Sequence, residues 1–539
     1  MKLLMKWVGC AVCVVMMGGV GSAQRSESEL VRFVQSHYTK QEYRIPMRDG
    51  VKLYTQVYTP IARKMEDKGP YPFLMTKTPY SCGNYDNDTI APHTTENEAL
   101  LRSGYILVCQ DVRGRWASEG TWEEMTPSHD GKGIDESTDM YDTVEWMLKH
   151  VPDNDGRVGL LGISYGGFYT ASSIIDSHPA IKAASPQAPI IDLWMGDDSY
   201  HGGALMLQAN HTFYMGFKPQ QNPIKVEPKR GFDYGSKGMY AYYMKMGTLE
   251  KLDSPESGTN PYFHDLVVHS TYDAYWKERN LAPHMHGVKA AVLDVGGLFD
   301  AEDIVGPVKV FHAIDRLSPE ATENTLIEGP WFHGQWARDL GEHLGDVHFG
   351  SDTAVFYRNE IEAPFFEHWL KEKAWNALPK AYVFETGSDV WKKYAAWPPP
   401  VAKKKMLYLE PGGGLGWNAP TAAASKDEYV SDPANPVPYV AESKGTGVPR
   451  EYMDGDQRFV AKRADVLVFQ TEPLTEDVTI AGPVTPTLKI ASTGTDSDFV
   501  VKLIDVYPAN YDGPEGKLAG YEMMVRGEPM RAKFRKSWE

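Results

Sequence analysis

Three short runs in the first third of the chain are apolar on both faces and end in turn residues. They cover residues 71–76, 105–110 and 157–163. Strands buried in a parallel sheet show this pattern, because helices cover the sheet on each side. Between the second and third runs, residues 135–150 carry apolar positions at helical spacing, which predicts a crossover helix. Strand, helix and strand in this order predict a parallel sheet of the α/β class.

The apolar pattern changes twice further along the chain. Residues 191–285 are rich in Met, Tyr, His and Gly and lack buried-strand runs, so we predict a helical cap inserted into the sheet domain. The sheet domain then comprises 24–190 and 286–378, the second part ending in a helix at 361–371. From 379 to 539, Pro-rich stretches and short alternating runs predict an all-β domain. Its expected strands include 466–470, 478–480, 487–491 and 499–506.

The first 23 residues predict a secretory signal peptide. Lys2 and Lys6 precede an apolar run over 7–20, and residues 21–23 offer a small-residue cleavage site. A membrane anchor is the alternative, but this run is shorter than the about 20 residues that span a bilayer. We therefore expect a periplasmic or secreted protein.

Composition narrows the range of partners. A chain of 539 residues exceeds the about 250–300 residues that one core supports, so several domains are expected. The formal net charge of -17 repels polyanions, so nucleic acid is not an expected partner.

Beyond the leader only two cysteines remain, Cys82 and Cys109, either as a disulfide or as two buried thiols. The sequence has no His and Cys cluster with metal-ligand spacing, and we expect no cofactor.

Residues 162–167, Gly-Ile-Ser-Tyr-Gly-Gly, lie between a predicted strand and a predicted helix. This is the context of a nucleophile elbow, in which glycines permit a turn too tight for larger side chains. The turn exposes the hydroxyl of Ser164 beside a helix N-terminus. Ser164 is therefore the candidate nucleophile for acyl transfer.

A serine nucleophile needs a histidine base and an orienting carboxylate, which follow it at the ends of later strands. Asp300 comes after the predicted strand at 290–295, and His333 comes after the predicted strand at 324–328. We predict a triad of Ser164, Asp300 and His333. The oxyanion of the intermediate needs two donors, for which the amide of Tyr165 and the phenol of Tyr80 are candidates.

Five motifs together resemble the cocaine esterase and X-Pro dipeptidyl-peptidase superfamily, and in particular the α-amino-acid ester hydrolases. The motifs are Thr78-Pro79-Tyr80, Gln110-Asp111-Val112-Arg113-Gly114, Gly162-Ile163-Ser164-Tyr165-Gly166-Gly167, Gly297-Leu298-Phe299-Asp300 and Gly329-Pro330-Trp331-Phe332-His333. The resemblance implies an α/β-hydrolase domain, a helical cap and a C-terminal jelly roll. It also implies the oxyanion roles of Tyr80 and Tyr165.

The same resemblance implies that Asp198, Glu302 and Asp303 bind the ammonium group of the substrate. Several carboxylates around a desolvated pocket favour a cationic amino group over neutral or anionic acyl groups. Asp197 takes the place of Asp198 if the register differs by one residue.

The activity implied by the resemblance is hydrolysis of α-amino acid esters through an acyl-enzyme, with transfer of the acyl group as a further outcome. Esters, peptides and β-lactams are the expected small-molecule partners, and relatives of this type commonly form homo-oligomers. An X-Pro dipeptidyl-peptidase or a glutaryl- or cephalosporin-type acylase is the alternative on this scaffold. An inactive glycan-binding protein is a third reading, because jelly rolls often bind glycans. In the family the jelly roll continues past the region resembling 531–538, so we expect an incomplete β domain.

Overall fold

The computed structural model describes residues 29–539 except 87, 227–231, 233, 236–238, 255–259, 422–424, 442–449, 512 and 514–516. The predicted signal peptide, residues 1–23, lies outside the described residues. Within the described ranges, no helix is both long enough and apolar enough to cross a membrane.

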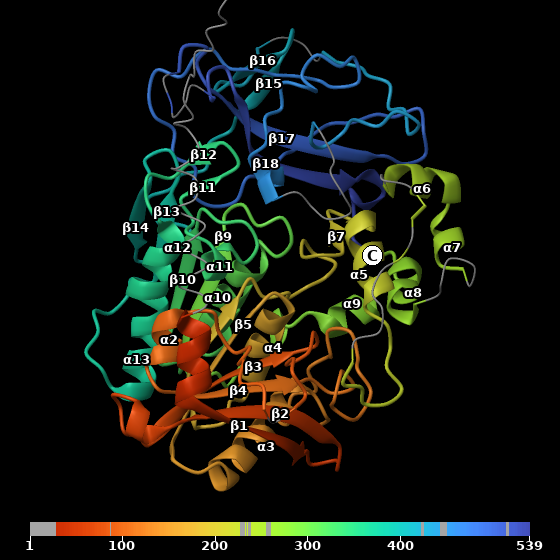
Figure 1. Ribbon diagram of the computed structural model, residues 1–539. Helices are drawn as coiled ribbons and strands as arrows, with labels where there is room; N and C mark the ends of the chain where they lie inside the picture. Colours follow the sequence, from red (N-terminus) through yellow and green to blue (C-terminus); the bar gives the residue numbers. More distant parts are fainter. Residues whose placement is uncertain are drawn as a thin grey trace, which may run out of the picture.

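A ten-stranded sheet forms the centre of the larger part of the molecule (Figure 1), in the order β1-β2-β4-β3-β5-β6-β9-β10-β13-β14. The strands are β1 (Tyr38–Pro46), β2 (Lys52–Pro60), β3 (Tyr71–Thr78), β4 (Ile106–Asp111), β5 (Asn154–Ile163), β6 (Ile181–Gln187), β9 (Ala291–Gly297), β10 (Glu323–Gly329), β13 (Ala381–Glu385) and β14 (Val390–Tyr394). Neighbours from β4 to β13 pair in parallel, while β1, β2 and β14 pair antiparallel at the edges. The predicted parallel sheet of an α/β-hydrolase is confirmed.

Two apolar cores cover the two faces of the sheet. Along β3, Phe73 and Met75 belong to one core and Leu74 to the other, because successive side chains of a strand point to opposite faces. The first core includes residues of α3 (Glu136–His150), α4 (Tyr165–Ser173) and α10 (Gly306–Leu317). The second includes residues of α2 (Glu98–Arg102), α12 (Thr353–Phe356), the π-helical turn Tyr357–Glu362 and α13 (Ala363–Lys371).

The predicted crossover helix is α3, and its start is set by a capping box. The side chain of Asp135 accepts a hydrogen bond from the Thr138 amide, and the Thr138 hydroxyl accepts one from the Asp135 amide, each at 2.9 Å. These bonds satisfy amide groups that have no intrahelical partner. The helix therefore begins within one residue of the start predicted at 135.

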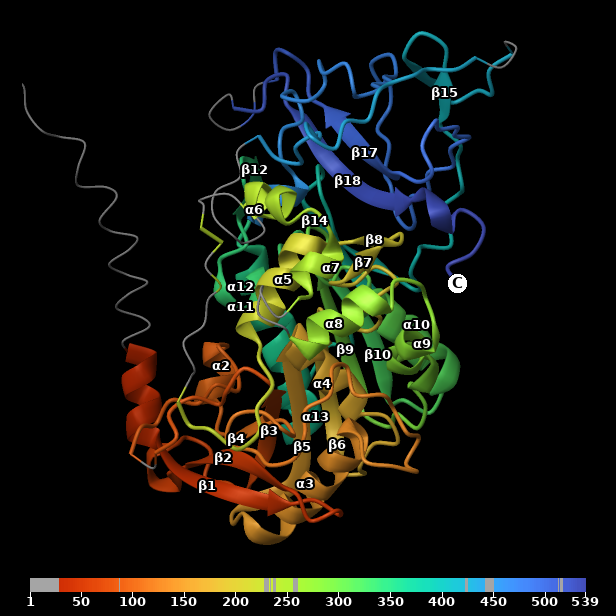
Figure 2. The same cartoon turned by 90° about the vertical axis from the view of Figure 1, so that its right-hand side faces the viewer.

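The helical cap contains α5 (Leu207–Gly216), α6 (Met239–Met246), α7 (Leu249–Leu252), α8 (Pro261–Val268) and α9 (Ala274–Arg279). A short hairpin of β7 (Tyr200–His201) and β8 (Ala204–Leu205) precedes them. Figure 2 shows the cap between the sheet domain and the C-terminal domain. Tyr214 and Phe217 of this region belong to the first core, so the cap packs directly on the sheet domain.

Two strands of the large sheet lie beyond the predicted boundary at residue 379. β13 pairs in parallel with β10, with Leu326 opposite Ala381, so the sheet continues to Tyr394. The edge strand β14 is mostly half-buried or exposed, and it therefore shows none of the continuous apolar pattern of the central strands.

The C-terminal domain is β-rich, as predicted. Its strands are β15 (Tyr408–Glu410), β16 (Gly414–Gly416), β17 (Asp498–Val506) and β18 (Glu522–Arg531), paired as two hairpins. The expected strand at 499–506 is confirmed, whereas 466–470, 478–480 and 487–491 are not strands in the structure. Alternation of apolar residues predicts a strand only where a neighbouring strand supplies hydrogen bonds, and Val478, Ile480 and Ile490 are instead exposed.

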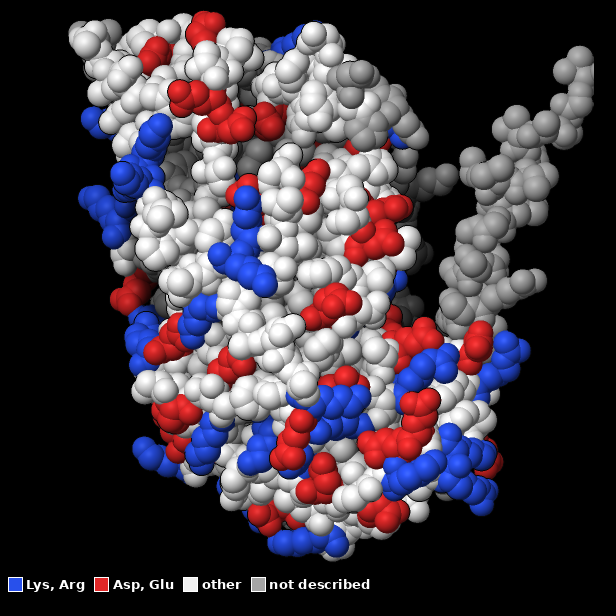
Figure 3. All heavy atoms as spheres, turned by 90° about the vertical axis from the view of Figure 1, so that its left-hand side faces the viewer, with Lys and Arg blue, Asp and Glu red and all other residues white. Residues whose placement is uncertain are grey.

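The C-terminal domain shares an apolar core with the sheet domain. Met453, Tyr521 and Met524 of the former pack in one cluster with Phe299 and Phe384 of the latter. On the face shown in Figure 3, basic and acidic side chains are interspersed over the sheet domain.

Candidate active site

The three predicted catalytic residues meet at one edge of the sheet. Ser164, Asp300 and His333 follow β5, β9 and β10, whose carboxyl ends point the same way. Catalytic groups of doubly covered parallel sheets lie at this edge. The structure therefore places the predicted residues where such a site is expected.

Ser164 sits on a sharp turn between β5 and α4. Its backbone has φ 64° and ψ -123°, a sparsely populated conformation for a residue with a side chain. A Cβ atom on Gly162 would lie 2.3 Å from the carbonyl oxygen of Gly166, and one on Gly167 would lie 2.5 Å from that of Gln187. The glycines of the motif are thus required by close backbone approach, as the sequence indicated.

Asp300 and His333 are hydrogen-bonded. His333 Nδ1 lies 2.8 Å from Asp300 Oδ2, while Asp300 Oδ1 accepts the amides of Glu302 and Asp303 at 2.8 and 3.0 Å. Asp300 is buried, and its carboxylate is fixed by three donors. The arrangement leaves Nε2 of His333 as the ring nitrogen that faces the remaining groups of the site.

Asp303 lies between the nucleophile and the base. The Ser164 hydroxyl donates to Asp303 Oδ2 at 3.4 Å, and the same oxygen lies 3.9 Å from His333 Nε2. Glu302 Oε2 is 3.7 Å from that nitrogen. Ser164 and His333 are thus both neighbours of the Asp303 carboxylate, and contacts of catalytic groups often tighten only when substrate binds.

The carboxylates control the protonation of His333. Burial disfavours the imidazolium, but Asp300 and Glu302 outweigh burial and raise the pKa of His333 to about 10. Burial also favours a neutral Asp300, yet the neighbouring His333 charge holds the pKa of Asp300 below its usual value. For Asp198 and Asp303, burial and then the neighbouring carboxylates raise the pKa well above that of a free aspartic acid. These carboxyl groups and His333 therefore titrate as one coupled group.

Asp198, and not Asp197, faces the site. Asp197 is buried, and its Oδ2 accepts the amides of Ile191 and Asp192, each at 2.9 Å, so it stabilises the preceding loop. Asp198 lies close enough to Glu302 and His333 to shift its own pKa. Glu302 and Asp303 thus lie near His333, the charge of Asp198 acts on the same ring, and Asp197 is engaged by its own loop.

Tyr80 stands on the loop after β3, beside the nucleophile elbow. Its ring contacts that of Tyr165 edge-on, with 6.4 Å between centroids, and it remains 37% exposed. Desolvation and then the carboxylates Asp198 and Asp303 raise the pKa of Tyr80 well above 10, which keeps the phenol a hydrogen-bond donor. Tyr165 is the first residue of α4, where amides have no intrahelical acceptor.

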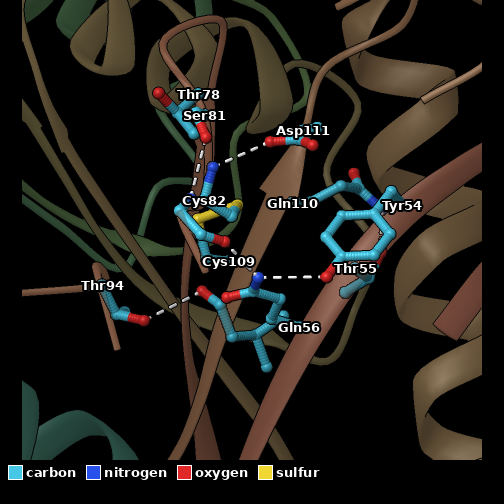
Figure 4. The surroundings of a disulfide bond; sticks show 12 residues. Tyr54, Thr55, Gln56, Thr78, Ser81, Cys82, Thr94, Cys109, Gln110 and Asp111 are labelled. Carbon is cyan, nitrogen blue, oxygen red and sulfur yellow. Dashed lines mark hydrogen bonds between the residues drawn. A yellow bond between two sulfur atoms is a disulfide. The ribbon is translucent and has the colours of Figure 1, made fainter. Parts of the chain in front are cut away.

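A disulfide fixes the loop that carries Tyr80. Cys82 is bonded to Cys109 of β4, and both are buried (Figure 4). The Cys82 amide donates to Asp111 Oδ1 at 2.9 Å, and Asp111 Oδ2 accepts from Tyr85 at 3.0 Å. The structure therefore selects the disulfide from the two alternatives that the sequence allowed.

Glu124, which no sequence pattern marked, contacts Tyr165 at the start of α4. Glu124 Oε1 accepts the hydroxyl of Tyr165 at 2.8 Å, and burial raises the pKa of Glu124 to about 7. Trp122 and Phe217 pack nearby with 4.7 Å between ring centroids, and Phe217 also contacts the Tyr80 ring. Residues 122–124 follow no periodic pattern, so the only signal was a pair of acidic residues after Trp122 in a loop.

The fold and its motifs define a serine hydrolase of the α/β-hydrolase class. The chain belongs to the X-Pro dipeptidyl-peptidase (S15) family, whose sequence profile matches residues 49–335. The profile of the X-Pro dipeptidyl-peptidase C-terminal non-catalytic domain matches residues 373–537. The protein is accordingly a serine esterase or peptidase of this family.

Individual relatives support the same assignment. The cocaine esterase of Rhodococcus sp. (strain MB1 Bresler) is 29% identical over 485 residues, which cover 86% of this chain and 79% of that protein. The structure of an α-amino acid ester hydrolase is similar with a TM-score of 0.83 and 34% identity, covering 93% of this chain and 83% of that one. An aminopeptidase from the marine sediment archaeon Thaumarchaeota archaeon gives a TM-score of 0.82 and 33% identity with the same coverage.

Proposed function

We propose that the protein hydrolyses esters of α-amino acids whose amino group is free and charged. The observation that supports this most strongly is the set of three carboxylates, Asp198, Glu302 and Asp303, around His333. A substrate ammonium among them gains Coulombic attraction in a desolvated site, where such attraction is stronger than in water. An acyl group without the ammonium leaves these carboxyl groups without a cationic partner.

The reaction follows from the positions of the remaining groups. His333 removes the proton of Ser164 as its oxygen attacks the ester carbonyl, and Asp300 orients the imidazole and stabilises its charge. The phenol of Tyr80 and the amide of Tyr165 donate to the oxyanion. His333 then protonates the leaving alcohol, and water attacks the acyl-enzyme by the reverse sequence. An amine in place of water yields acyl transfer.

The ammonium of the substrate also helps to activate the base. A cation bound beside Asp198 and Asp303 repels the imidazolium, and it therefore lowers the raised pKa of His333. A substrate that lacks the amino group leaves His333 protonated over more of the physiological pH range. Selection of amino esters thus acts on the catalytic step as well as on binding.

The test compares D-phenylglycine methyl ester with phenylacetic acid methyl ester, which differ in the amino group alone. The expected result is a strong preference in kcat/KM for the amino ester. Ser164→Ala should hydrolyse neither substrate. Asp198→Asn should reduce the preference while keeping turnover of the phenylacetic ester. Equal rates for the two esters in the wild type would refute the ammonium site and leave a general esterase.

A further inference from the structure

A pocket adjoins His333. It has a volume of about 300 Å³, and its walls include Phe332, His333 and Glu302 together with Arg338 and Arg450. Neither Tyr80 nor Tyr165 lines it. Since His333 delivers a proton to the leaving group, a pocket that shares His333 but not the oxyanion donors is placed to receive that group.

The two arginines reach the pocket from different parts of the fold. Arg338 ends α11 (Gln335–Arg338), the helical turn that follows His333 directly. Arg450 stacks on the ring of Phe332, with its guanidinium carbon 4.8 Å from the ring centroid. When a guanidinium stacks on an aromatic face, its N–H groups point outward from the stack and can donate to a carboxylate.

Arg450 comes from the C-terminal domain. It begins the 3-10 turn Arg450–Met453, and Met453 is buried in the core that this domain shares with Phe299. Phe299 and Phe332 directly precede Asp300 and His333. The same apolar contact therefore supports the loops of the acid and the base and sets the position of Arg450.

Two carboxylates, Glu302 and Asp339, line the pocket beside the two arginines, and each has a partner of its own. Glu302 Oε2 lies 3.7 Å from His333 Nε2. Asp339 Oδ1 accepts the amides of Leu340 and Gly341 at 2.6 and 3.3 Å, so this carboxylate stabilises its own loop. Arg338 pairs with Glu96 at 3.3 Å, but both side chains are about 60% exposed, and such pairs contribute little. Arg338 can exchange this partner for a substrate carboxylate at small cost.

We propose that this pocket binds a carboxylate carried by the leaving group. The inference rests on the proposed function, which places the ammonium of the substrate among Asp198, Glu302 and Asp303. A substrate with an ammonium on the acyl side and a carboxylate on the leaving side then spans the two charged regions, with the scissile bond at Ser164 and His333. Short peptides with free termini have this chemistry, as do α-amino acyl esters of hydroxy acids. The C-terminal domain thereby contributes to substrate selection.

The experiment uses two alanine esters that differ in one charge. L-alanyl glycolate and L-alanyl glycolamide have leaving groups of nearly equal size, and their hydroxide-catalysed rates correct for intrinsic reactivity. The full-length wild type should prefer the glycolate ester in corrected kcat/KM by about tenfold or more, the range of one hydrogen bond to a charged group. L-alanine methyl ester reports the proposed amino ester activity independently.

Variants assign the preference to the pocket. Arg338→Gln with Arg450→Gln should bring the ratio of glycolate to glycolamide close to one, while Arg450→Lys should keep part of it. Arg535→Gln, an exposed arginine of the same domain, should keep the wild-type ratio. Hydrolysis of alanine methyl ester with no glycolate preference would overturn the carboxylate pocket alone. Failure to hydrolyse any of the three amino esters would overturn the proposed function and the pocket with it.

Discussion

Removal of the disulfide should reduce both stability and turnover. The bond closes a loop of 27 residues between Cys82 and Cys109. The entropy that this closure removes from the unfolded chain corresponds to about 3.5 kcal/mol at 25 °C. For a domain of this size, each kcal/mol shifts the melting temperature by about 2–4 °C, so the expected loss is about 7–14 °C for the sheet domain.

The activity should fall for a separate reason. Cys82 lies two residues after Tyr80, and the bond and Asp111 together hold the loop that positions the phenol. Because the oxyanion forms only during the reaction, a displaced donor lowers kcat more than it raises KM. The assay measures kcat and KM of the Cys82→Ala, Cys109→Ala double variant at 25 °C, a temperature at which the variant is still folded. Dithiothreitol should have no further effect on this variant.

Two results would refute the reasoning. A melting temperature within about 2 °C of the wild type would show that the bond does not constrain the unfolded chain as calculated. An unchanged kcat in the folded double variant would show that the hydrogen bonds of Asp111 hold Tyr80 without the disulfide.

The remaining predictions concern single side chains of the site. Asp198→Asn should raise KM for D-phenylglycine methyl ester by about tenfold, the effect of one hydrogen bond to a charged group, as measured by initial rates. Glu302→Gln removes a negative charge that raises the pKa of His333, so the acid limb of the pH profile of kcat/KM should move to lower pH; an unmoved limb would contradict this. Tyr80→Phe should lower kcat by about 100-fold with a small change in KM, which steady-state kinetics tests.

The sequence predicted the central sheet and the elbow because these parts depend on local rules. Buried parallel strands are apolar on both faces, and the elbow at Ser164 needs glycines at fixed positions. Asp300 and His333 were found because catalytic groups follow strand ends in a fixed chain order. Asp300 and His333 follow the neighbouring strands β9 and β10, so their order along the chain already predicted that they lie close together.

Other features depend on contacts that no local pattern reveals. The pairing of Cys82 with Cys109 follows from the neighbouring positions of the loop and β4 in three dimensions. Glu124 contacts Tyr165 from a loop 41 residues away, with no periodicity to mark it. The pairing of β13 with β10, beyond the closing helix, is likewise a contact between distant parts of the chain that no local pattern marks.

The most direct test of the central claim is covalent labelling with a pair of phosphonate diphenyl esters, one with an α-amino group and one without. Attack by a serine oxygen on phosphorus expels phenol and leaves a stable phosphonyl adduct whose position peptide mapping identifies. The account predicts an adduct on Ser164 that forms much faster with the amino phosphonate, with the difference in rate reduced in Asp198→Asn. Labelling of another residue, or equal rates for the two reagents on Ser164, would contradict it.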